Sequence, residues 1–152
     1  MKEKATKQVL PIVAILSVTL IFACTQKETE SFYDNGQALK EVYYKTDGDK
    51  KEITKVIYYY RNGLPESITR YSNSKKHGKV ESFYANGKTA SSEKYNNGEL
   101  HGECHYYNEN GMPLYTAEYN NGLSHGEWKF FDENGKLVNT QHYQNGKLVE
   151  QN

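Results

Sequence analysis

The sequence predicts an all-β protein: an elongated antiparallel β-meander of about five 24-residue hairpin repeats, preceded by an N-terminal signal segment. Three observations predict this fold. Each of the 12 glycines follows Asn, Asp or His, the glycines recur in fixed phase, and aromatic and β-branched residues fill the segments between them. Turn residues that separate short runs of this kind are typical of β-hairpins.

The glycines define the repeat. Five of them follow aromatic runs, at spacings of 27, 24, 24 and 24 residues: Gly36, Gly63, Gly87, Gly111 and Gly135. A tyrosine lies eight residues after each, and three of these tyrosines precede a second glycine: Gly98, Gly122 and Gly146. His-Gly links follow in the same phase. The first repeat is irregular, because Asp47-Gly48 is followed by extra residues, 49–52. A fixed period with atypical ends indicates a repeat array.

Each repeat reads as two short strands. In the last repeat, residues 127–131 alternate between polar and aromatic, residues 132–135 form a turn, and residues 136–143 form the second strand. Asn-Gly is favoured where two adjacent residues need positive φ, so it marks hairpin turns. We therefore expect about ten strands of five to seven residues each.

The first 24 residues differ from the rest. Three lysines and one glutamate precede an uncharged stretch, residues 9–23, which resembles a secretory signal peptide and is too short for a membrane-spanning helix. Ile21-Phe22-Ala23-Cys24 resembles the bacterial lipobox, which implies lipidation of Cys24. We expect residues 1–23 to be a signal peptide, 24–30 the lipidated Cys and a tether, and 31–152 the repeat domain.

Charge and hydropathy exclude two classes of protein. The chain has 19 basic and 19 acidic residues, so a nucleic-acid binder that relies on a basic surface is disfavoured. Mean hydropathy of -0.90 disfavours a polytopic membrane protein. Loss of the signal segment removes three lysines and one glutamate, which leaves 16 basic and 18 acidic residues and a net charge of −2.

Aromatic residues must supply the apolar area of a thin sheet, since the 14 tyrosines outnumber most aliphatic residue types. The tyrosines in one phase should stack along one face, two strands apart: Tyr71, Tyr95, Tyr119 and Tyr143. Cys104 occupies the same place after a His-Gly link as Val80 and Trp128, so we expect a buried, inert thiol.

The segments 97–103 and 121–128, each followed by paired aromatics and Asn-Gly, resemble the MORN repeat. They are most similar to its second bacterial variant, found in YwqK-type antitoxins of toxin–antitoxin systems. The resemblance covers about residues 31–150. It implies a flat β-meander that binds another protein, in the antitoxin case a toxin.

No residue set predicts catalysis, a cofactor or a metal site. His77, His101 and His125 recur at 24-residue spacing, but equivalent positions two strands apart lie roughly 9–10 Å from each other, too far to share one zinc ion. Two serine–lysine pairs, at residues 72–75 and 91–94, fall outside the helix start that acyl-transfer enzymes need. We expect no catalytic residues and no enzyme activity.

The aromatic runs are the candidate binding residues: Tyr58, Tyr60, Tyr106, Tyr107, Trp128 and Phe130. Three interpretations remain open, namely packing of a thin sheet, protein contact and glycan stacking. The function expected is a lipid-anchored, non-catalytic scaffold that binds an unknown protein in the bacterial envelope, in one version a toxin bound by an antitoxin or immunity protein. In a Gram-negative cell this would lie at the outer membrane or cell surface. The alternative is a glycan or cell-wall adhesion module.

Overall fold

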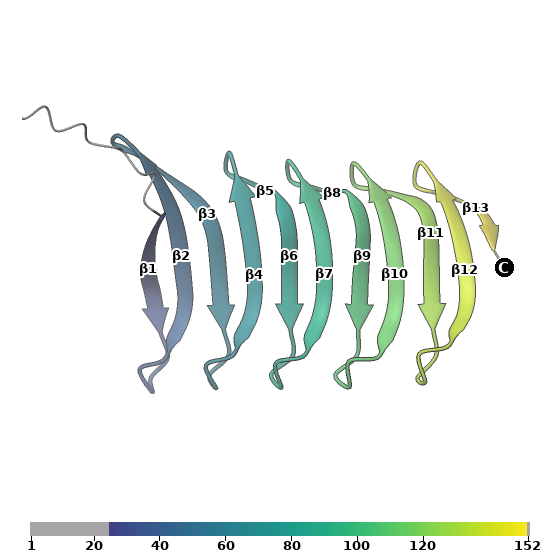
Figure 1. Cartoon of the computed structure of the whole chain (residues 1–152), viewed down its shortest axis with the longest axis horizontal. Coiled ribbons are helices and arrows are strands. Elements are labelled where there is room, and N and C mark those ends of the chain that lie inside the picture. The colour runs from purple at the N-terminus through teal and green to yellow at the C-terminus, as the bar shows by residue number, and fades with distance from the viewer. Residues whose placement is uncertain (1–24, 152) are drawn as a thin grey trace, which may run out of the picture.

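The computed structural model describes residues 25–151, all of whose regular structure is β-strand (Figure 1). The signal segment and Cys24 lie outside the described residues. The strands are β1 Thr25–Phe32, β2 Ala38–Asp47, β3 Lys50–Tyr59, β4 Pro65–Ser72, β5 Lys75–Lys76, β6 Gly78–Phe83, β7 Thr89–Asn96, β8 Glu99–Leu100, β9 Gly102–Tyr107, β10 Pro113–Asn120, β11 Leu123–Phe131, β12 Leu137–Gln144 and β13 Lys147–Gln151.

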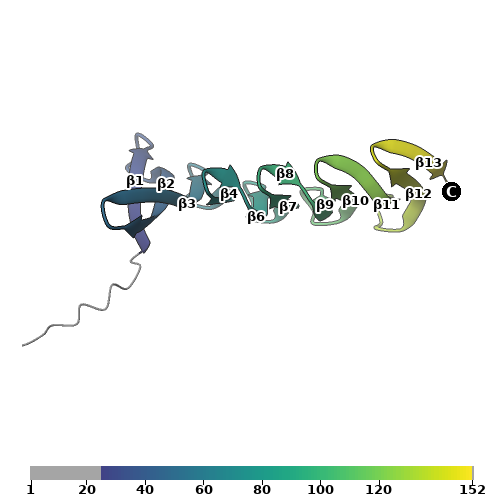
Figure 2. The same ribbon diagram turned by 90° about the horizontal axis from the view of Figure 1, so that it is seen from above.

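Consecutive strands pair antiparallel in chain order from β1 to β13, and the two-residue strands β5 and β8 pair with β4 and β7. The views in Figures 1 and 2 show one elongated, twisted row of strands. In the described part of the chain no second sheet and no helix covers either face, and no helix there is long and apolar enough to span a membrane. The predicted all-β meander is confirmed.

The five turns at the bottom of Figure 1, here the lower turns, join the two strands of each main hairpin. In the third, the N–H of Tyr84 donates to the carbonyl of Lys88 at 2.8 Å, and the N–H of Gly87 donates to the carbonyl of Tyr84 at 2.8 Å. Gly87 has φ +84, whereas Asn86 is not among the residues with positive φ. This is a three-residue loop, a type I turn that ends in a left-handed glycine.

The upper turns, at the other end of the strands, use Asn-Gly differently. Asn97 and Gly98 both have positive φ, at 50° and 97°, as the mirror-image turn of a two-residue hairpin requires. The expected pair of positive φ angles is therefore correct for the upper Asn-Gly turns and wrong for the lower turns, where one glycine is sufficient, and in the first upper turn only Gly48 has positive φ. Asn73 and Ser74 adopt the same upper geometry, with φ 50° and 61°, although no glycine is present.

The core is as thin as the composition predicts. Among the described residues, the buried apolar side chains are Val42, Val56, Ile57, Cys104 and Ala117. A single row of strands cannot enclose more, because each residue faces one side or the other and only neighbouring side chains cover it. Half-buried tyrosines provide that cover, and the expected burial of Cys104 is confirmed at 0% exposure.

The register places the in-phase tyrosines on one face, here the tyrosine face, defined by Tyr71, Tyr95, Tyr119 and Tyr143. They do not stack directly on one another. Trp128 lies between two of them, with ring centroids 5.3 Å from Tyr119 and 4.9 Å from Tyr143. The intervening strand of each repeat separates the tyrosines, which agrees with the expectation that they lie on one face, two strands apart.

Two further details differ from expectation. Residues 25–30, predicted as part of a tether, form most of β1 and pair with β2 from Thr25↔Lys45 to Thr29↔Glu41. The strands are also more numerous and longer than expected, up to 10 residues in β2 and β3. The extra residues after Gly48 lengthen this hairpin beyond the repeat pattern.

Candidate functional site: an aromatic row and a groove on one face

A row of six aromatic rings crosses strands β9–β12 on the tyrosine face. Tyr106 stacks on Tyr115 with centroids 4.3 Å apart, and Tyr115 lies 5.9 Å from Phe130 and 6.4 Å from Trp128. Trp128 connects this stack to Tyr119 and Tyr143. All six rings are half-buried, and no other layer of the described chain covers them. Here these rings are called the aromatic row.

Hydrogen bonds hold two rings of the aromatic row, Tyr106 and Trp128, and also the nearby Tyr95. The Tyr106 and Tyr95 hydroxyls both donate to the Glu93 carboxylate, at 3.2 and 3.1 Å. The Trp128 indole N–H donates to the carbonyl of Glu118 at 3.2 Å. Burial, together with the Glu93 charge, raises the pKa of Tyr95 to about 12 and that of Tyr106 further. The phenols therefore stay neutral at physiological pH and present a rigid, apolar surface.

Cys104 and Ala117 lie opposite each other beneath these rings and are both fully buried. Burial raises the pKa of the Cys104 thiol. A thiol that is buried and held in its neutral form is a poor nucleophile. Cys104 is therefore a packing residue, in agreement with its alignment with Val80 and Trp128.

The six predicted binding residues divide into separate groups. Tyr106, Trp128 and Phe130 belong to the aromatic row. Tyr107 lies on the opposite face, where it stacks with His105 at 6.4 Å. Tyr60 belongs to a lower turn, and its hydroxyl donates to the carbonyl of Phe83 at 2.7 Å. Tyr58 is 41% exposed and lies on the tyrosine face, but in a groove at the other end of the sheet.

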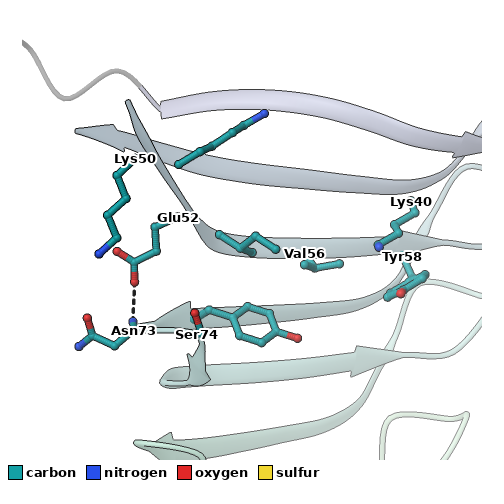
Figure 3. Close-up of a pocket in the computed structure, with 10 residues that line it drawn as sticks. Lys40, Lys50, Glu52, Val56, Tyr58, Asn73 and Ser74 are labelled. Carbon is teal, nitrogen blue, oxygen red and sulfur yellow. Dashed lines mark hydrogen bonds between the residues drawn. The ribbon is translucent and has the colours of Figure 1, made fainter. Parts of the chain in front are cut away.

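That groove, of about 650 Å³, opens between the upper part of β3 and the turn after β4 (Figure 3). Its lining mixes apolar, aromatic, cationic and polar side chains. The lining residues are Lys40, Lys50, Lys51, Glu52, Ile53, Val56, Tyr58, Tyr71, Asn73 and Ser74. Nine of these ten residues belong to the irregular segment between Asp47 and Lys75, so the departure from the 24-residue spacing creates the groove.

The lysines of the groove are held to different degrees. Lys40 bonds Glu30 at 2.7 Å and lies 5.8 Å from the centroid of the Tyr58 ring. Lys51 pairs with Glu28 and lies over the Tyr44 ring at 3.8 Å. Within residues 25–151, the Lys50 side chain makes no hydrogen bond or ion pair, so its ammonium group is available to an incoming anion.

The histidines do not converge. His77 and His101 are exposed, and His125 is partly buried. Among residues 25–151 no group of three or more His, Cys, Asp or Glu side chains could hold a metal ion. The sequence reasoning missed Tyr115 and Glu93, which lie outside the paired aromatic runs. It also missed the groove, although the 27-residue spacing was a visible signal of an irregular junction.

Comparisons with known proteins agree with this architecture. The MORN repeat variant matches residues 26–46, 76–97, 100–121 and 124–145. The segment that forms most of the groove falls between the first two matches. No curated protein matches the chain. Among solved structures, the chain is similar to a TarM mutant from S. aureus in complex with Fondaparinux, alpha-GlcNAc-glycerol and UDP, at 14% identity and a TM-score of 0.36.

That match covers 83% of this chain and 21% of the other, so the chain spans about a fifth of that protein's length, and no conclusion below depends on it. The repeat matches, in contrast, cover more than half of the chain and coincide with the hairpins described above. The chain therefore belongs to the MORN repeat variant family and is a repeat scaffold.

Proposed function

We propose that this scaffold binds another protein through its tyrosine face, without catalysis. The observation that carries the proposal is the aromatic row: six rings in contact on the open face of a one-layer sheet. Large aromatic side chains are enriched among the residues that dominate binding energy in protein interfaces. Because neighbouring strands fix the rings, a partner loses little affinity to ordering them.

We further propose that the scaffold acts in the bacterial envelope, anchored by lipid at Cys24. The lipobox-like sequence before Cys24 supports this location. β1 begins at Thr25, the next residue. A lipidated Cys24 would therefore hold the sheet directly at the membrane surface, with no tether between them. An antitoxin or immunity role is the most specific form of the proposal, with a toxin as the bound protein.

The binding proposal is tested by capture from envelope extracts, with the full chain in a mild non-ionic detergent as bait. Phe130→Ala and Tyr143→Ala truncate two rings of the aromatic row. Tyr107→Ala truncates a half-buried ring on the opposite face and serves as the matched control. Circular dichroism confirms that each variant is folded.

We expect a specific partner whose affinity falls about tenfold in the row variants, as is typical of truncated hot-spot residues, and is unchanged in the control. Equal capture by all three variants would contradict binding at the tyrosine face. Retention on peptidoglycan or glycans without a protein partner would favour the adhesion alternative, since aromatic rings also stack on sugars.

The anchor is tested separately. Cys24→Ser removes the thiol that lipidation needs, so the protein should move from the membrane fraction to the soluble fraction. Metabolic labelling with a fatty-acid analogue should mark the wild type and not the variant. An unlabelled wild type, or a variant that remains in the membrane fraction, would refute the anchor.

A further inference from the structure

In residues 25–151, hydrogen bonds join each upper turn to the next. The groove beside β3 lies at the one junction where this hydrogen bond differs from the others. At the regular junctions the upper glycine donates to a backbone carbonyl 22 residues earlier: Gly98 to Lys76, Gly122 to Leu100 and Gly146 to Ser124, at 2.8–2.9 Å. The corresponding pair would be Ser74 and Glu52. Instead, the N–H of Asn73 donates to the Glu52 side-chain carboxylate at 2.6 Å (Figure 3).

At this junction a side chain therefore makes the hydrogen bond that two backbone groups make at the regular junctions. β3 pairs with β4 only along residues 55–59. Residues 50–53 of β3 pair with β2 alone. Among the described residues, the backbone groups of this segment that face away from β2 have no strand partner. A short unpaired strand edge of this kind accepts an extended peptide as an additional strand.

The side chains around this edge favour an acidic peptide with apolar side chains. Ile53 and Tyr58, 40% and 41% exposed, together with the buried Val56 offer an apolar surface. The ammonium group of Lys50 has no hydrogen-bond or ion-pair partner within residues 25–151. Beyond the groove, Arg70 and Lys79 are already paired with Glu81, at 3.1 and 2.6 Å, whereas Lys75 and Lys76 form no ion pair within residues 25–151. The one acidic side chain of the lining, Glu52, is already bonded to Asn73.

We propose that the groove is a second binding site, which takes an extended acidic segment of a protein by addition of a strand to residues 50–53 of β3. The inference rests on the proposed protein-binding function and assigns it a second contact region, separate from the aromatic row. An anionic glycan would satisfy the lysines, but it would leave the unpaired strand edge unused, which is why the peptide is preferred.

The test uses the full chain in detergent and a fluorescein-labelled, acetylated octapeptide of alternating Glu and Val, followed by fluorescence anisotropy at low ionic strength. Lys50→Glu reverses the charge in the groove. Lys136→Glu makes the same change at an exposed lysine of a distant lower turn and is the matched control. We expect Lys50→Glu to weaken binding about fivefold and Lys136→Glu to leave it unchanged.

Hydrogen exchange tests the added strand directly, because binding by charge alone would not protect backbone amides of β3. The peptide should protect amides within residues 50–54, and the same peptide with alternate backbone amides N-methylated should lose that protection. The proposal is overturned if the two lysine variants bind equally, if no amide there is protected, or if an oligogalacturonate of equal charge binds as well as the peptide. If any of these results is obtained while the aromatic row still captures its partner, the groove is refuted as a binding site and the proposed function stands.

Discussion

The hydroxyl of Tyr84 donates a hydrogen bond to the backbone carbonyl of Tyr107, 2.7 Å away, and so joins the lower turn of one hairpin to the next hairpin. The same bond joins Tyr33 to Tyr59 and Tyr60 to Phe83. In the last two turns Asn108 and Asp132 replace the tyrosine and accept hydrogen bonds from backbone N–H groups of their own turns. The first three lower turns are thus linked to the next repeat, and the last two cap themselves.

Tyr84→Phe should lower the free energy of unfolding by about 1 kcal/mol, since it removes one hydrogen bond and leaves the carbonyl of Tyr107 without this donor. Urea denaturation followed by tryptophan fluorescence measures the change. Tyr71→Phe is the control, because the Tyr71 hydroxyl makes no hydrogen bond within residues 25–151. Equal effects of the two substitutions would show that the inter-hairpin bond contributes nothing.

Ser74→Gly should stabilise the protein by about 1 kcal/mol, because Ser74 holds a left-handed φ of 61° at the position that glycine fills in the later upper turns. The reverse change, Gly98→Ser, places a side chain at φ 97° and should destabilise by a similar amount. Thermal denaturation of both variants tests the pair. A Ser74→Gly protein that melts at or below the wild-type temperature would contradict this account.

Glu41 should make stability depend on acid pH. Burial raises its pKa, but hydrogen bonds from Lys27, Tyr59 and Tyr43 outweigh burial, so the net pKa is lowered. A carboxyl with a lowered folded pKa stabilises above its unfolded value of about 4.5, and this contribution disappears as pH falls through the folded pKa. Stability should therefore decline below about pH 4.5.

Glu41→Gln should flatten this decline, and Glu133→Gln in an exposed turn should not. Urea midpoints measured at several pH values between 3 and 7 compare the three proteins. If Glu41→Gln keeps the full wild-type slope, the buried carboxylate is not the group responsible.

Cys104 should resist modification in the folded protein, since its thiol is fully buried and its pKa is raised. Ellman's reagent should react with it at the rate of local or global unfolding, and rapidly in concentrated urea. Cys24→Ser gives the clean background for this measurement. Rapid reaction in native buffer would refute the inert, packed thiol.

The positions of the turns were predictable from the sequence, because left-handed backbone conformations restrict the choice of residue. Gly87 and Gly98 lie in turns where the spacing places them. The different geometries of these two turns were not predictable, since both contain Asn-Gly. Only strand pairing distinguishes a two-residue from a three-residue loop. In the same way, the position of Trp128 between Tyr119 and Tyr143 depends on tertiary packing.

Of the candidate site, the sequence identified half of the aromatic row through Tyr106, Trp128 and Phe130. Tyr115 escaped notice because it has no aromatic neighbour in sequence and joins the row only across strands, through its partners Tyr106 and Phe130 and through Trp128. The groove was less visible still. The 27-residue spacing from Gly36 to Gly63 marks an irregular junction, but the point at which β3 separates from β4 depends on tertiary packing.

Within residues 25–151 each hairpin pairs with the hairpins beside it in the sheet, so a structural change at one junction alters few contacts elsewhere. The lengthened hairpin β2–β3 shows the result: it carries a groove, while the register of the repeats from Gly78 to Tyr143 stays regular. Such an array can acquire a new recognition module at one junction and keep the others intact. Specificity can thus evolve, or be engineered by grafting, one turn at a time.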